Sequence, residues 1–150
     1  MPWTKPVTDL DLCYLSASEA IRRFKQRTLS PVELLNAQIQ RAQDVEPKFN
    51  HFTLRHFERA LSQAKQAEKR YAKKSARLRP LEGITVAIKD ENAIKDEVTT
   101  SGSLIYKDNI ATSTSLSVER ILKAGGILHA RSACPEFACA GVTHSKLWGV

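Results

Sequence analysis

Two short apolar runs with a helical segment between them constrain the fold of the second half of the chain. Residues 83–88 (GITVAI) are rich in β-branched side chains and predict a buried strand. Residues 115–124 have one apolar helical face and are followed by Gly125-Gly126, a pair typical of helix ends. Residues 127–131 predict a second strand. This order is that of a βαβ unit, so the two strands are expected to pair in parallel.

Two capping patterns predict helices in the first half of the chain. Ser16 and Ser30 each precede a glutamate by three residues, so that a hydroxyl and a carboxylate can satisfy the first free amides of a helix. We expect the first helix to reach about Arg27 and the second to end at Pro47, because proline lacks a backbone donor. Residues 1–15, which have no clear period, are predicted to form an extended arm.

One basic stretch accounts for the charge of the whole chain. The formal net charge is +7, and residues 55–79 alone hold nine basic and two acidic residues. We predict a third helix over residues 55–78 with its cations turned to solvent. The side chains expected to face the core are Phe57, Leu61, Ala64 and Tyr71. Because no aromatic residue except Tyr71 is interleaved with the cations to stack on bases, we do not expect nucleic acid as a partner.

The composition is that of an ordinary globular chain. Its 150 residues are 42% hydrophobic and 26% charged, enough for one domain with its own core. No apolar run approaches the roughly 18 residues of a membrane span, and no secretory signal pattern is present. Three unevenly spaced cysteines favour a reducing compartment. We expect a cytoplasmic protein without a membrane partner, and these features are compatible with a homo-oligomer.

Lys89 is the first residue that could carry chemistry. It directly follows the first predicted strand, and ligands of parallel sheets bind at the carboxyl ends of the strands. Burial at that position would favour the neutral amine, which accepts a proton. The structural alternative is a lysine that reaches water or pairs with Asp90.

Two further sets of residues contain nucleophiles or metal ligands. Ser101 and Ser103 lie in the loop 99–103 (TTSGS), but a Gly-x-Ser-x-Gly elbow is missing and turn formation explains the loop. A zinc site would use four residues at five-residue intervals, which match no structural zinc pattern well: His129, Cys134, Cys139 and His144. The sequence also lacks a phosphate loop and a dinucleotide fingerprint, so we expect no metal and no cofactor.

Six short stretches occur in an order and spacing that resemble a known family. They are residues 83–90 (GITVAIKD), 99–103 (TTSGS), 124–128 (AGGIL), 135–138 (PEFA), 141–143 (GVT) and 148–149 (WG). Together they resemble the amidase signature family, whose members hydrolyse carboxylic amides or transfer amide nitrogen. The resemblance implies an α/β fold with N-terminal helices around the beginning of a mixed, partly parallel sheet. It implies a single amidase domain, with residues 1–79 mainly helical and residues 80–150 starting the α/β core.

The family uses a nucleophilic serine, a bridging cis-serine and a lysine. By the resemblance Lys89 is the triad lysine, held uncharged in a dry crevice to take a proton through the cis-serine. Both serines are expected in a Gly/Ser-rich segment after Val150. The chain therefore resembles the N-terminal portion of an amidase, and we expect it to be inactive alone. No matching motif assigns Ser101, Ser103 or Ser132 to the missing roles.

Two departures from the family pattern leave the subclass open. Thr85 stands where the family often has proline, and residues 130–133 (ARSA) replace a commoner Gly-Lys-Thr-Asn run. The resemblance implies a small-molecule amide as the substrate. One alternative is the A-type subunit of a tRNA-dependent amidotransferase, which the basic stretch would suit. Another alternative, from a different class, is a non-catalytic basic interaction module.

Overall fold

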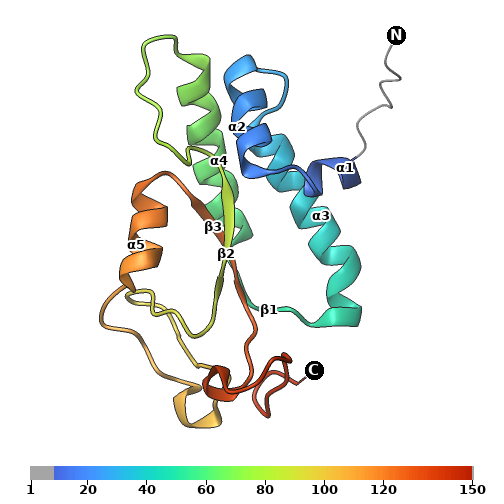
Figure 1. The fold of residues 1–150 in the computed structure, drawn as a ribbon, viewed down its shortest axis with the longest axis vertical. Coiled ribbons are helices and arrows are strands. Elements are labelled where there is room, and N and C mark those ends of the chain that lie inside the picture. Colours follow the sequence, from blue (N-terminus) through green and yellow to red (C-terminus); the bar gives the residue numbers. More distant parts are fainter. Residues whose placement is uncertain (1–8, 150) are drawn as a thin grey trace.

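The computed structural model describes residues 9–149, in which helices surround a small sheet (Figure 1). The three strands lie in the order β1-β3-β2. The elements are α1 (Asp9–Cys13), α2 (Ala17–Gln26), α3 (Pro31–Phe49), β1 (Phe52–Arg55), α4 (Phe57–Ala72), β2 (Thr85–Lys89), the 3-10 helix η1 (Leu104–Tyr106), α5 (Leu116–Lys123), β3 (Ile127–Ser132) and the 3-10 helix η2 (Glu136–Ala138).

The sheet is mixed, as the family resemblance implies. Strands β2 and β3 are parallel, and their register runs from Thr85 opposite Ile127 to Lys89 opposite Ser132. Strand β1 pairs antiparallel with the last part of β3 only, at residues 130–132. Both parallel strands point toward the end of the molecule where the loops on either side of η1 and η2 gather (Figure 1). The predicted βαβ unit is therefore confirmed.

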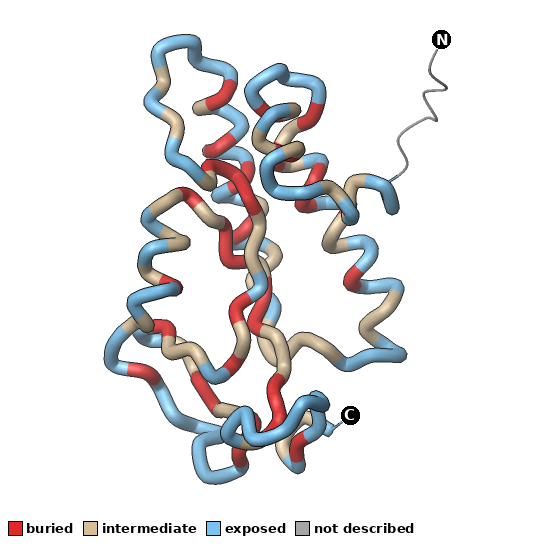
Figure 2. Tube along the Cα trace, in the orientation of Figure 1, coloured by how far each residue is buried: buried red, intermediate tan, exposed pale blue. Residues whose placement is uncertain are grey.

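Helices cover both faces of the sheet. Successive side chains of β3 point to opposite faces, so each face has apolar side chains on which a helix packs. Ile127 packs with Leu35 of α3 and with alanines of α4. Its neighbour Leu128 packs on the opposite side with Ile88 and with Val118 of α5. Figure 2 shows the resulting buried residues concentrated along the strands and on the inner sides of the helices.

The capping patterns form as predicted, but to different extents. Ser30 accepts hydrogen bonds from the backbone amides of Val32 and Glu33, and the Glu33 carboxylate accepts one from the Ser30 amide at 2.7 Å. Ser16 accepts from the Glu19 amide at 3.2 Å, whereas the Glu19 carboxylate turns to two arginines instead. Helix α2 thus has half of the reciprocal pattern that begins α3.

Two predictions for the first half of the chain are wrong. Residues 9–13 of the predicted extended arm form α1, whose Leu12 packs against the core, while residues 1–8 lie outside the described residues. Helix α3 continues through Pro47 to Phe49 and ends at Asn50 in the left-handed conformation. A single proline removes one intrahelical hydrogen bond, and here two further residues stay helical past it.

The third helix is shorter than predicted, and its core face matches the prediction at Ala64 and Tyr71 only. Helix α4 ends at Ala72, where the backbone becomes extended at Lys73. Its buried face consists mainly of small residues: Ala60, Ala64, Ala67 and the larger Tyr71. Alanine brings the helix backbone close to its neighbours, whereas Phe57 and Leu61 remain only partly buried. Among residues 9–149, no helix combines the length and the apolar character that a membrane crossing requires.

Candidate active site

Lys89 lies at the carboxyl end of β2, as predicted. It is the last residue of the strand, and its neighbour Asp90 continues the pairing through a backbone hydrogen bond to Ser132. The Lys89 Nζ lies 3.3 Å from Glu91 Oε2, and the side chain is 40% exposed. The expected dry crevice is therefore not formed by residues 9–149. An ion pair with Glu91, and not with Asp90, holds the amine.

Asp90 is the buried centre of this end of the sheet. The residue is 1% exposed, and its carboxylate accepts hydrogen bonds from the Thr100 hydroxyl and from the Thr100 backbone amide, the latter at 3.1 Å. The Trp148 indole donates to Asp90 Oδ2 at 3.3 Å and to the Thr100 hydroxyl at 3.1 Å. Arg131 adds an ion pair at 3.7 Å. One carboxylate thus joins the strand end, the loop 99–103 and the segment around Trp148.

The loop 99–103 is fixed against η2. Ser103 is fully buried and donates a hydrogen bond to Glu136 at 2.7 Å, while the Phe137 amide donates to the Ser101 carbonyl at 2.8 Å. Gly102 has a φ of 66°, and a Cβ there would lie 2.6 Å from the carbonyl oxygen of Cys134. The loop serves turn formation, as expected from its composition, and the Ser103 hydroxyl is committed to Glu136.

Arg131 is a site residue that the sequence does not single out. Its guanidinium is fully buried and donates to the carbonyls of Asn92 at 2.7 Å and Ile88 at 3.3 Å. It also lies 3.5 Å from a carboxylate oxygen of Glu97. These contacts tie the backbone on both sides of Lys89 to β3. The only signal for it in the sequence is the unusual run 130–133, which by itself indicates no more than a variation in packing.

The four residues considered as zinc ligands are not grouped as a metal site in the described part of the chain. His129 lies in β3, where burial lowers the pKa of its imidazole despite a hydrogen bond with the Val86 backbone. Cys134 is buried, and burial raises the pKa of its thiol. Cys139 and His144 are exposed. Within residues 9–149, no three His, Cys, Asp or Glu side chains are grouped to hold a metal ion.

At this end of the sheet the Lys89 amine is paired with Glu91, and the neighbouring Asp90 is bonded to the loop 99–103. Asp90 and Arg131 fix the backbone on both sides of Lys89 through their contacts with Thr100, Ile88 and Asn92. The sequence predicted the position of Lys89 correctly, whereas the contacts that fix this position join residues far apart in the chain. This is the end of the sheet at which parallel α/β proteins place their ligands.

Comparisons with known proteins show which family the chain resembles. The family model described as Amidase matches residues 33–150. An acylamidase from Rhodococcus erythropolis is 34% identical over 95% of this chain and 30% of its own length. The A-type subunit of a glutamyl-tRNA(Gln) amidotransferase from Dehalococcoides mccartyi (strain CBDB1) is 31% identical over 92% of this chain and 28% of its own length.

A solved structure shares the fold. Fatty acid amide hydrolase superposes with a TM-score of 0.86 and 22% identity, over 98% of this chain and 26% of that chain. The chain thus spans about 30% of the length of the curated relatives that it matches. Since the family match covers most of residues 1–150 and the fold agrees, the chain belongs to the amidase signature family.

Proposed function

We propose that this chain supplies the lysine and the surrounding strand ends of an enzyme that hydrolyses carboxylic amides. The observation that carries the proposal is the position of Lys89. It ends β2 within the stretch 83–90 that resembles the family motif, and it lies next to the buried Asp90. The relative named acylamidase supports an amide as the substrate class.

In the proposed reaction, the Lys89 amine is neutral when the substrate binds. A serine oxygen attacks the amide carbonyl carbon, and its proton passes through a second serine to Lys89. The proton then leaves with the departing amine, and water cleaves the acyl ester. The neutral amine requires Lys89 to lose both its contact with Glu91 and its exposure to water. Additional protein surface over this end of the sheet would achieve both.

We propose further that the two serines are not among residues 1–150. Ser103 is buried and bonded to Glu136, and Ser101 lies in a turn at a φ of 49°. Neither belongs to a Gly/Ser-rich motif of the family type. The isolated chain is therefore expected to turn over no amide. Turnover by the purified chain that is lost in Lys89→Ala would contradict this part of the proposal.

A chimera tests the role of Lys89 directly. The chain would replace the matching 30% of the Rhodococcus erythropolis acylamidase, and release of p-nitroaniline from p-nitroacetanilide would be followed. We expect activity in the chimera and a loss of about 1,000-fold or more in Lys89→Ala. Lys107→Ala is the matched control, because Lys107 is 61% exposed and its ion pair is with its neighbour Asp108. An active chimera that tolerates Lys89→Ala would refute the assignment.

A second candidate function is amide transfer on a charged tRNA. It is favoured by the relative named as a glutamyl-tRNA(Gln) amidotransferase and by the cations at the end of α4. Arg70 is bound to Glu82, so a test on tRNA binding should change Lys69, Lys73 and Lys74 instead. Fluorescence anisotropy with labelled tRNA should then give binding that salt weakens steeply and that the triple glutamine variant loses. Absence of salt-sensitive binding would exclude a tRNA contact through this surface.

A further inference from the structure

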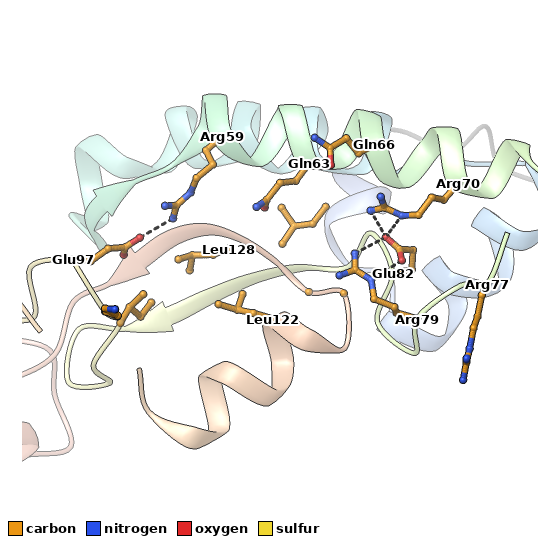
Figure 3. Close-up of a pocket in the computed structure, with 15 residues that line it drawn as sticks. Arg59, Gln63, Gln66, Arg70, Arg77, Arg79, Glu82, Glu97, Leu122 and Leu128 are labelled. Carbon is orange, nitrogen blue, oxygen red and sulfur yellow. Dashed lines mark hydrogen bonds and ion pairs between the residues drawn. The ribbon is translucent and has the colours of Figure 1, made fainter. Parts of the chain in front are cut away.

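A groove separate from the Lys89 site runs between α4 and the strand β3 (Figure 3). Its volume is about 600 Å³, within the range of small-molecule sites. It begins near Glu82, passes Gln63 and Leu128, and ends near Glu97. Lys89, Asp90 and the loop 99–103 do not line it. Any ligand of this groove would therefore be independent of the proposed amide chemistry.

One end of the groove carries more positive than negative charge. Glu82 is fully buried and accepts hydrogen bonds from Arg70 at 2.6 and 2.9 Å and from Arg79 at 2.8 and 2.9 Å. Two guanidinium groups thus share one carboxylate, and the Nη1 group of each takes no part in these bonds. Arg77, which also lines the groove, forms no ion pair with residues 9–149.

The end of the groove near Glu97 also carries more positive than negative charge. Glu97 Oε1 accepts a hydrogen bond from Arg59 at 2.8 Å, and its Oε2 lies 3.5 Å from the buried Arg131. Burial lowers the pKa of the adjacent His56, so this imidazole adds no charge near neutral pH. Lys95 lines the groove and is exposed, without an ion pair to the described residues. The lining residues carry five cations and two carboxylates, an excess of three positive charges.

The middle of the groove is suited to an organic body. Gln63 and Gln66 of α4 are exposed, and within residues 9–149 their amides make no hydrogen bond, so both are available to a ligand. Opposite them, the floor is formed by Leu122 and Leu128, which Figure 3 shows on the far side of the groove from α4. An apolar floor with a few free amides is typical of sites for small organic molecules.

We propose that this groove binds an organic phosphate of nucleotide size, with its phosphates at the arginines and its apolar or planar body over Leu122 and Leu128. A phosphate monoester carries close to two negative charges at pH 7, and a diphosphate about three, which matches the excess on the walls. A guanidinium group can bind phosphate oxygens through two N–H donors at once. In Arg70 and Arg79 the Nη1 group is not bonded to Glu82, so it can donate to a phosphate while the contact with Glu82 is kept.

Calorimetry on the 150-residue chain with ADP tests the proposal. We expect saturable binding that salt weakens, and binding of adenosine or inorganic phosphate at least about tenfold weaker than that of ADP. Two variants should each weaken ADP binding about tenfold or more. Arg77→Gln with Lys95→Gln removes unpaired cations, and Gln63→Glu with Gln66→Glu places carboxylates in the middle of the groove.

The matched control is Lys65→Gln with Lys69→Gln. It removes two cations from α4 that do not line the groove, so ADP affinity should change less than about twofold. Equal urea midpoints for all variants would establish that folding is unchanged. Failure of ADP to bind at millimolar concentration, or equal weakening by the control, would overturn the proposal. Inorganic phosphate binding as tightly as ADP would overturn it as well. None of these outcomes depends on amide hydrolysis, so failure here leaves the proposed function untouched.

Discussion

The indole nitrogen of Trp148 donates a hydrogen bond of 3.3 Å to the carboxylate of Asp90, 58 residues earlier in the chain. A second hydrogen bond, from Asn50 to the Trp148 carbonyl at 2.5 Å, ties the same segment to the end of α3. The segment around Trp148 contains neither a helix nor a strand of its own. Its position beside Asp90 therefore depends on these long-range contacts.

Removing the Asp90 carboxylate should destabilise the protein more than removing the indole donor. Asp90→Ala leaves the buried Arg131 without this partner and should lower the free energy of unfolding by about 3–5 kcal/mol. Trp148→Phe keeps an aromatic ring and should cost about 1 kcal/mol. Urea unfolding followed by circular dichroism measures both. The control is Asp108→Asn, since that side chain is 87% exposed. An Asp90→Ala variant as stable as this control would contradict the role of Asp90.

Glu82 should make the stability depend on pH in the acid range. Burial alone would raise the pKa of Glu82, but hydrogen bonds from Arg79 and Arg70 outweigh it and lower the pKa from 4.5 to about 2. A depressed pKa stabilises the folded state above the ordinary pKa, and this contribution is lost as the pH falls from about 4.5 to 2. We expect a loss of roughly 2–3 kcal/mol over this interval, measured by urea unfolding at each pH.

The variant Glu82→Gln should flatten that pH dependence and lower stability at neutral pH. Glu19→Gln is the matched control, because Glu19 also has a pKa lowered to about 2 but pairs with arginines at the surface. Its effect should disappear in high salt, whereas the effect of Glu82 should persist. Equal salt sensitivity of the two variants would show that Glu82 behaves as a surface carboxylate.

Gly102 should not tolerate a side chain. A Cβ there would meet the Cys134 carbonyl oxygen at 2.6 Å, and the φ of 66° is unfavourable for alanine. Gly102→Ala should lower the free energy of unfolding by about 1–3 kcal/mol. Gly141→Ala is the control, because a Cβ at that position would have no atom within 4 Å and φ there is not positive. Similar melting temperatures of the two variants would contradict the close approach of the loop to Cys134.

The chain should self-associate through apolar side chains near the Lys89 end. Ile105 is 78% exposed, Val142 is 68% exposed, and Phe137 is 54% exposed with its ring 5.9 Å from that of Tyr106. Light scattering over a concentration series should give a rising mass, which Ile105→Lys reduces. Leu116→Lys changes an equally apolar residue on α5 and serves as the control. A concentration-independent monomer would contradict this prediction.

Local signals in the sequence predicted much of the fold. The Ser30 to Glu33 pattern placed the start of α3 correctly, because capping uses only neighbouring residues. The β-branched run before Lys89 predicted β2 correctly, because strand propensity also depends on neighbouring residues. Helix length was predicted less well. Helix α3 continued through Pro47 and α4 stopped at Ala72, and neither end was predicted from the neighbouring residues.

The sequence by itself determined the starts of α2 and α3, the parallel strand pair and the position of Lys89 at a strand end, since each follows from spacing along the chain. Only the tertiary structure decided that Asp90 and Arg131 form the buried support of this end, and that Lys89 pairs with Glu91. It also decided that arginines of one basic stretch are divided between Glu82 and Glu97 at the two ends of a groove. Burial and ion pairing depend on tertiary contacts between residues that are distant in the chain, and local sequence patterns do not specify these contacts.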